Sequence, residues 1–211
     1  MNARHNPYLL LGSLLLMIVF TPIFESVAIG RNVMDVLFCV LTVAIVLALD
    51  VRQSVRISAV VLAVSVLIVR LTGVIVIGEN FFISGYSLSL ALIIMAFFSL
   101  MKSILAAKFV SLDVIVDAIS AYLLIGVAWS FIFLIIHTFV PTAFDFGEID
   151  GYELWSKYLY LSFMTLTTLG YGDITSTNSI VQIWSVLESI VGVFFQAILI
   201  ARLVSLYGTR I

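Results

Sequence analysis

The sequence predicts an all-α membrane protein with six transmembrane helices and one shorter helix that enters the membrane without crossing it. Three observations predict this fold class. Of the 211 residues, 63% are hydrophobic and only 10% are charged, which leaves too little polar surface to cover a water-soluble globule. Apolar runs of about 20 residues, the length that a helix needs to cross hydrocarbon, recur along the chain. One further apolar run is too short for this.

Six long apolar runs are each expected to form one span. They cover residues 8–24, 33–49, 57–77, 86–105, 117–140 and 180–207. Arg4 precedes the first run and Ser26-Val27-Ala28 follows it, an arrangement that weakly resembles a cleaved signal peptide. We expect a retained span instead, because the distribution of basic residues requires one.

The short run covers residues 157–168, and Leu169-Gly170-Tyr171-Gly172-Asp173 follow it directly. A helix of a dozen residues cannot cross the bilayer. A helix and loop of this kind are tolerated at membrane depth only when they are buried in protein or line water. The sequence therefore predicts a re-entrant helix and loop between the last two spans.

The basic residues predict the orientation of the chain, because Lys and Arg accumulate on the cytoplasmic side of a cell membrane. With both termini cytoplasmic, seven of the ten basic residues lie on that side: Arg4, Arg52, Arg56, Lys102, Lys108, Arg202 and Arg210. Arg31 and Lys157 are then external, and Arg70 lies within a span. The re-entrant loop and the preceding acidic residues face outward, the latter being Asp145, Glu148, Asp150 and Glu153.

Several classes of protein are excluded by composition and motif. The net charge is only −2 and the basic residues are scattered, which argues against nucleic-acid binding. Cys39 is the single cysteine, so an internal disulfide and a cysteine-based metal site are excluded. No HExxH, GxSxG or phosphate-binding motif appears, so we do not expect an enzyme.

The segment Thr165-Leu166-Thr167-Thr168-Leu169-Gly170-Tyr171-Gly172-Asp173 resembles the signature of the tetrameric potassium channel family. The resemblance implies a homotetramer that conducts K⁺ passively, with four copies of the loop around one axis. It implies K⁺ ions bound in a selectivity filter formed by Thr168, Leu169, Gly170, Tyr171 and Gly172. Thr167 would support this filter, and Asp173 would concentrate cations at the outer mouth and hydrogen-bond behind it.

The residue types suit that role. Backbone carbonyls can replace the hydration shell of K⁺, and the Thr168 hydroxyl can add a further ring of oxygens. Gly170 and Gly172 reach positive φ without steric cost, which a strand with all its carbonyls on one side requires. Tyr171 is expected to point away from the ion and to brace the strand against the re-entrant helix. That helix, ending near Thr167, would direct its negative carboxyl end toward the central cavity.

The sixth span carries four further candidates. Gly192 stands where the family often has a hinge glycine, and close packing between helices is the alternative. Gln196 and Ile200 follow at helical spacing, and this stripe is expected to line the cavity. Glu188 is a carboxylate at membrane depth, which predicts a group facing the protein interior and reaching the re-entrant helix near Thr167. Its role is either gating or structural.

The first four spans resemble those of the voltage-gated subfamily in layout. We expect a peripheral module over residues 1–112 and a pore domain over residues 113–211. The fourth span lacks regularly spaced arginines, and its only charge is Lys102, so steep voltage gating is not expected. Asp35 and Arg70 are expected to form a buried ion pair between neighbouring helices.

Two smaller expectations concern the ends of the fifth span. Lys102, Asp113 and Asp117 share one helical face, which predicts a helix along the inner membrane surface. His137 is expected to be a satisfied interfacial group and not a pH sensor.

Three rival functions differ in class. A poorly selective cation pore is the first, a K⁺ uptake transporter the second and a membrane enzyme the third. Transporters of that kind carry four degenerate loops in one chain, whereas this chain has a single intact loop. The sequence does not distinguish between five possibilities for the gating stimulus: lipid, tension, protons, a separate partner, or no stimulus at all.

Overall fold

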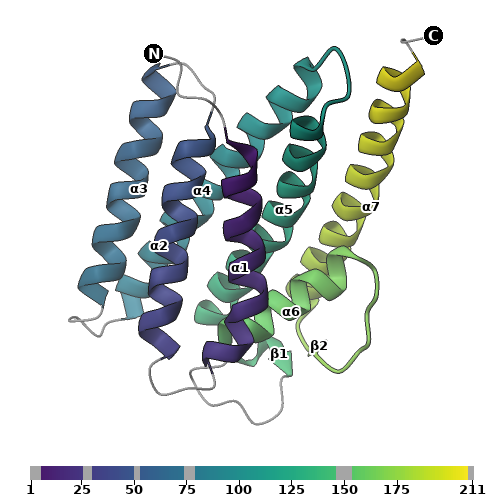
Figure 1. The fold of residues 1–211 in the computed structure, drawn as a ribbon. Helices are drawn as coiled ribbons and strands as arrows, with labels where there is room; N and C mark the ends of the chain where they lie inside the picture. The colour runs from purple at the N-terminus through teal and green to yellow at the C-terminus, as the bar shows by residue number, and fades with distance from the viewer. Residues whose placement is uncertain (1–5, 26–29, 50–52, 74–78, 146–153, 209–211) are drawn as a thin grey trace.

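A computed structural model describes residues 6–25, 30–49, 53–73, 79–145 and 154–208. Within these ranges the chain forms seven α-helices, one 3₁₀ turn and two very short strands. The six long helices run side by side, and the short helix α6 lies across one end of the bundle (Figure 1). In chain order the elements are α1 (Pro7–Glu25), α2 (Gly30–Ala48), α3 (Gln53–Gly73), α4 (Glu79–Ala106), α5 (Leu112–Phe139), η1 (Pro141–Ala143), β1 (Phe144–Asp145), α6 (Leu154–Leu166), β2 (Thr175–Ser176) and α7 (Ser179–Gly208).

Four helices of the described residues are long and apolar enough to cross a membrane. They contain the candidate spans Pro7–Phe24, Ile83–Ala106, Leu112–Phe139 and Ser179–Leu206. The chain is therefore a mainly helical membrane protein. In α2 the apolar part is the shorter segment Val33–Ala48, and α3 carries Arg56 and Arg70.

Helix α5 is the centre of the packing. It contacts α1, α4, α6 and α7, and its candidate span is more than half buried, at 56%. The candidate span of α7 is only 17% buried, although α7 is the longest helix. Burial thus falls steeply from the centre of the bundle to α7, which leaves an apolar face of α7 without contacts inside the chain.

The link between α4 and α5 corrects one expectation. Helix α4 continues to Ala106, and α5 begins at Leu112. Ser111 caps α5, because its hydroxyl accepts a hydrogen bond from the Val114 amide at 3.3 Å. The prediction of a separate surface helix carrying Lys102, Asp113 and Asp117 is wrong, since residues 107–111 form a short reversal.

Two strands join the loops on either side of α6. Strand β1 pairs antiparallel with β2, with Phe144 opposite Ser176. Next to this pair, the Thr177 amide donates to Ala143 O at 3.1 Å and the Thr177 hydroxyl donates to Thr142 O at 2.6 Å. The chain that leaves α5 is therefore fastened to the chain that enters α7.

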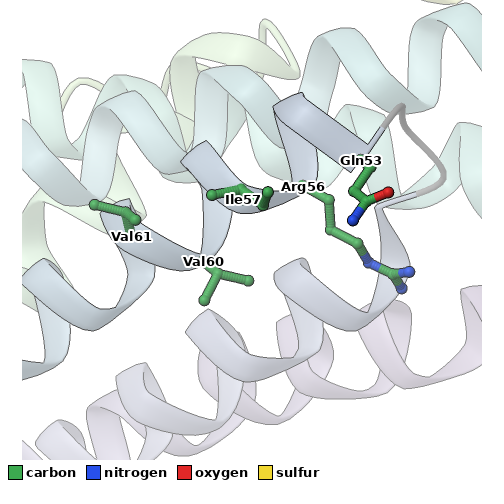
Figure 2. Close-up of a pocket in the computed structure, with 5 residues that line it drawn as sticks. All are labelled: Gln53, Arg56, Ile57, Val60 and Val61. Carbon is green, nitrogen blue, oxygen red and sulfur yellow. The ribbon is translucent and has the colours of Figure 1, made fainter.

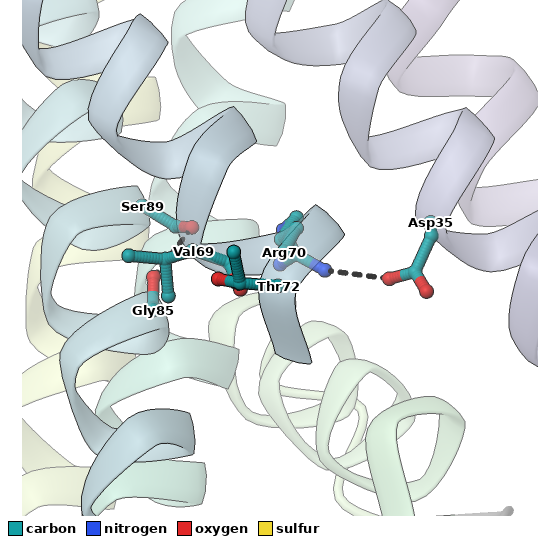
Figure 3. Close-up of polar contacts among 6 residues, drawn as sticks. All are labelled: Asp35, Val69, Arg70, Thr72, Gly85 and Ser89. Atoms are coloured by element: carbon teal, nitrogen blue, oxygen red, sulfur yellow. Dashed lines mark hydrogen bonds and ion pairs between the residues drawn. The ribbon is translucent and has the colours of Figure 1, made fainter. Parts of the chain in front are cut away.

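Asp35 on α2 and Arg70 on α3 lie opposite one another between neighbouring helices (Figure 3). Arg70 Nη1 is 3.5 Å from Asp35 Oδ1, and both side chains are mostly buried, with 12% and 28% of their surfaces exposed. The Arg70 guanidinium carbon also lies 3.7 Å above the centre of the Phe38 ring. This cation therefore has an anion on one side and an aromatic face on the other.

Several sequence expectations concern residues outside the described ranges. They are the basic residues Arg4, Arg52 and Arg210, the acidic residues Glu148, Asp150 and Glu153, and the segment Ser26-Val27-Ala28.

A shallow hollow of about 500 Å³ lies along the first turns of α3 (Figure 2). Its lining residues, Gln53, Arg56, Ile57, Val60 and Val61, all belong to α3. A surface formed by one helix does not enclose a ligand, so the candidate site lies elsewhere.

Candidate functional site

The candidate site begins where α6 ends. Carbonyls in the last turn of a helix lack intrahelical partners. Here Met164 O accepts from the amides of Leu169 and Gly170, at 2.9 and 3.2 Å, and Thr165 O accepts from the Thr168 amide at 3.0 Å. These bonds tie the loop 167–173, which we call the signature loop, to the end of α6.

The backbone of the signature loop alternates in handedness. Thr168, Gly170 and Gly172 have φ values of +60°, +50° and +77°. Thr168 is the single non-glycine residue with positive φ in the described parts of the chain. An ordinary strand points successive carbonyls to opposite sides, whereas alternating handedness turns them toward the same side. The sequence indicated positive φ at both glycines but did not indicate it at Thr168.

The signature loop is exposed in the single chain. Leu169 has 56% of its surface exposed and Tyr171 has 71%. Thr167 is exposed too, and its hydroxyl donates to Phe163 O at 2.6 Å. Most of the Tyr171 side chain thus has no neighbour within one chain, and its expected bracing of the loop against α6 stays a prediction.

Asp173, after the second glycine, is held on two sides. Tyr160 on α6 donates its hydroxyl to Asp173 Oδ2 at 2.7 Å, and the Ile174 amide donates to Asp173 Oδ1 at 3.1 Å. The hydrogen bond to Asp173 raises the pKa of Tyr160 to about 12, so the hydroxyl keeps its proton at neutral pH. The end of the signature loop is thus fastened to α6.

Glu188 on α7 is fully buried and reaches α6, as the sequence indicated, but its partner is Ser162 and not a threonine near Thr167. Ser162 Oγ lies 2.5 Å from Glu188 Oε1 and 2.7 Å from Gly126 O of α5. Gly126 also permits the close packing of α6 on α5, since an added Cβ would come within 2.7 Å of the Phe163 ring. Polar groups from three helices, α5, α6 and α7, therefore contact one another behind the signature loop.

Further contacts continue along α7. The Ser189 hydroxyl donates to Thr165 O at 3.0 Å. Gly192 lies against Leu166, where an added Cβ would overlap the Leu166 carbonyl oxygen. This geometry favours the close-packing interpretation of Gly192 over the hinge interpretation.

Gln196 is joined to α5 by a hydrogen bond. Its Nε2 donates to the Tyr122 hydroxyl at 2.9 Å, and that hydroxyl lies 3.4 Å from Leu166 O. Gln196 is also exposed, and Ile200 is 62% exposed. The expected stripe is therefore divided, because Gly192 is buried against α6 while the other two face outward from the single chain. A cavity-lining role for Gln196 and Ile200 stays a prediction.

His137, near the end of α5, is packed against aromatic rings. Its ring centre lies 5.7 Å from that of Tyr158 and 6.4 Å from that of Phe144. Its Nδ1 is buried and makes no hydrogen bond to any described residue. The expectation of a satisfied group is therefore wrong for this nitrogen.

The sequence did not single out Tyr160, Ser162, Tyr122 or Gly126. The sequence indicates their roles only weakly, because a hydroxyl-bearing residue or a glycine on an apolar helix usually serves helix packing. Each becomes informative only through its partner, which lies on another element.

Comparison with known proteins adds one finding. Residues 119–208 match the model of a protein family described as an ion channel. The matched residues begin in α5 and include α6, the signature loop and the whole of α7. No curated protein and no solved structure matches the chain.

The match and the apolar helices together support a membrane-embedded ion channel. The description of the matching family names ion transport and no catalysed reaction. The matched region coincides with the part of the structure in which α6 and α7 meet.

Proposed function

We propose that this chain is one subunit of a K⁺-selective channel that conducts K⁺ passively through the signature loop. One observation carries the proposal, namely positive φ at every second residue, Thr168, Gly170 and Gly172, within the sequence TLGYG. K⁺ must lose its water to pass a narrow pore, and rings of main-chain oxygens can replace that water. Alternating handedness is the backbone arrangement that gives such rings.

The exposure of the single chain supports assembly with further copies of itself, and the resemblance to tetrameric potassium channels makes a homotetramer the proposed assembly. One copy of the signature loop cannot surround an ion, so several copies around an axis are needed. The exposed side chains of Leu169 and Tyr171, together with the sparsely buried helix α7, provide surfaces for neighbouring copies. The remaining apolar faces would contact membrane lipid. The proposed ligand of the signature loop is K⁺, which is also the ion that the channel conducts. We propose no organic cofactor.

We also propose six membrane spans, formed by α1 to α5 and α7, with both termini in the cytoplasm of a cell membrane. The start of α1 and the end of α7 lie at one end of the bundle, and α6, β1 and β2 lie at the other (Figure 1). Arg56, Lys102, Lys108 and Arg202 lie near the first end. The Asp35–Arg70 pair reduces the cost of placing α3 in lipid. Residues 1–112 then form the peripheral module and residues 113–211 the pore domain.

Ion flux from liposomes tests this function. Purified protein is reconstituted with an internal K⁺ load, and K⁺ release is measured with and without external Ba²⁺. We expect release that Ba²⁺ blocks, and a reversal potential in mixed Na⁺ and K⁺ close to that of K⁺. A reversal potential midway between the two ions would indicate a poorly selective pore and would contradict the proposal.

A pair of glycine variants links the flux to the signature loop. Gly170→Ala places a Cβ at φ +50°, in the left-handed region, where an L-residue pays about 1–2 kcal/mol. Nothing lies within 4 Å of that Cβ in the single chain, so the backbone itself is strained. Gly12→Ala is the matched control, because its Cβ also meets nothing within 4 Å and its φ is ordinary. We expect flux to be lost in the first variant and retained in the second.

A further inference from the structure

Ser162 Oγ has two oxygen neighbours but only one hydrogen to donate. Gly126 O, at 2.7 Å, is a carbonyl oxygen and can only accept. Glu188 Oε1, at 2.5 Å, accepts when the acid is ionised and can donate only when it is protonated. If Glu188 were ionised, one of the two contacts would join two oxygens with no hydrogen between them.

We propose that Glu188 carries a proton and donates it to Ser162, which in turn donates to Gly126 O. This directed relay joins α7, α6 and α5 in that order, and every short contact in it then contains one hydrogen. The proposal adds to the proposed function and rests on it, because a positioning role for Glu188 presupposes that the signature loop conducts K⁺. Glu188 becomes a positioning residue that fixes the pore helix α6 behind the signature loop.

The surroundings of Glu188 agree with a neutral acid. The side chain is 0% exposed, and among the described residues no Lys or Arg forms an ion pair with it. Its Oε2 is buried and has no hydrogen-bond partner in the described parts of the chain. An unpartnered carboxylate oxygen is far more costly to bury than the carbonyl oxygen of a protonated acid.

Among the described residues, few other groups can influence this proton. From α5, Tyr122 is the titratable side chain that interacts electrostatically with Glu188. From α6, Ser162 is the polar partner, and on α7 itself Ser189 bonds to Thr165 O instead. Tyr122 is itself occupied by Gln196, which donates to its hydroxyl. None of these groups supplies a positive charge that would favour an ionised Glu188.

The proposal also explains why a serine and a glycine stand opposite the acid. The Ser130 hydroxyl donates to Gly126 O as well, at 2.8 Å, so two hydroxyls converge on this one carbonyl. Because Gly126 O can only accept, Ser162 must act as a donor there, which leaves its lone pairs for Glu188. Replacing the relay by a single hydrogen bond would leave either Gly126 O or Glu188 in a repulsive contact.

Infrared spectroscopy of the full-length protein in liposomes tests the proton directly. We expect a carbonyl stretch of a protonated carboxyl group at neutral pH, which shifts in D₂O and is absent from Glu188→Gln. Asp113→Asn is the matched control, because Asp113 is exposed and its loss should leave that band unchanged. Absence of a band difference between the wild type and Glu188→Gln would overturn the proposal.

Ser162→Ala gives a second measurement that does not require Glu188→Gln to fold. It keeps the acid but removes the acceptor of its proton, so the carboxyl band should shift and not vanish. An unchanged band would overturn the Glu188-to-Ser162 direction. Since these spectra need no ion flux, a protein that shows the band but conducts no K⁺ would contradict only the proposed function.

A functional comparison separates positioning from mere bulk. Glu188→Gln keeps a hydrogen-bond donor at the same place. Glu188→Leu keeps a side chain of similar volume but removes that donor. We expect K⁺ flux near the wild-type level in the first variant and strongly reduced flux in the second. Equal flux in both variants would overturn the positioning role.

Discussion

Tyr160 donates its hydroxyl to Asp173 at 2.7 Å and thereby joins α6 to the far end of the signature loop. The start of the loop is bonded to the last carbonyls of α6. The loop is therefore held at both ends by the helix that precedes it. Such anchoring is what a narrow ring of main-chain oxygens needs, because a small displacement would change the distance between each oxygen and the ion.

Removing the Tyr160 hydroxyl should loosen the outer end of the loop. We expect Tyr160→Phe to reduce K⁺ flux severalfold and to weaken discrimination against Na⁺, measured in the liposome assay. Tyr8→Phe is the control, because it removes an exposed tyrosine hydroxyl that interacts with Asp113 at the opposite end of the bundle. Equal loss of flux in both variants would assign the effect to general destabilisation.

The same bond predicts a pH dependence. The pKa of Tyr160 is raised above its ordinary value of 10 to about 12, so the protonated form is favoured in the folded protein. The stabilising effect is fully present below pH 10 and is lost as the pH rises toward 12. Between about pH 6 and 9 the Tyr160 hydroxyl stays protonated, so we expect its titration to cause no change in wild-type flux. A flux change in that range that disappears in Tyr160→Phe would contradict this assignment.

Helices and the signature motif could be predicted from sequence because both are local. Apolar runs gave the long helices to within several residues, and Gly170 and Gly172 indicated the unusual backbone. Thr168 was not predicted to share it, since a residue with a Cβ ordinarily avoids positive φ. Its conformation is imposed by the hydrogen bond from its amide to Thr165 O and by the turn that follows.

The partners of the polar residues could not be predicted, because they depend on the register between helices. Periodicity indicated that Glu188 faces the protein, but not that Ser162 lies opposite it. The predicted surface helix failed for a related reason, since a shared helical face means nothing across the reversal at Ser111. The long helices and the motif were therefore predictable from sequence, whereas the packing of α5, α6 and α7 decided which polar side chains meet.

Gly192→Ala distinguishes close packing from a hinge. The added methyl would overlap the Leu166 carbonyl, so α7 must move away from α6, at a cost of about 1–3 kcal/mol. We expect a lower unfolding temperature in detergent together with reduced flux. Gly12→Ala is the control, since its methyl meets nothing. Unchanged stability with altered channel opening would favour the hinge instead.

Arg202 on α7 is bound to the end of α4. Its Nη2 donates to Leu105 O, in the last turn of that helix, at 2.9 Å and to Ala107 O, just after the helix, at 3.0 Å. Arg202→Gln should therefore destabilise the protein by about 1 kcal/mol, measured by thermal unfolding. Lys108→Gln is the control, because it removes an exposed positive charge at the same end. An equal effect of both variants would indicate a general charge effect and not these bonds.

The conductance should depend little on voltage. Each elementary charge that crosses the field contributes only about 2.3 kcal/mol per 100 mV, so steep gating needs several mobile charges. Lys102 is the only basic residue on α4, and Arg70 is held by Asp35 and by the Phe38 ring. We expect an almost linear relation between current and voltage in planar bilayers with symmetrical K⁺, and no change in its shape in Lys102→Gln. A steep sigmoidal conductance curve would show that charge moves across the field. It would contradict the claim that Asp35 and the Phe38 ring hold Arg70 in place.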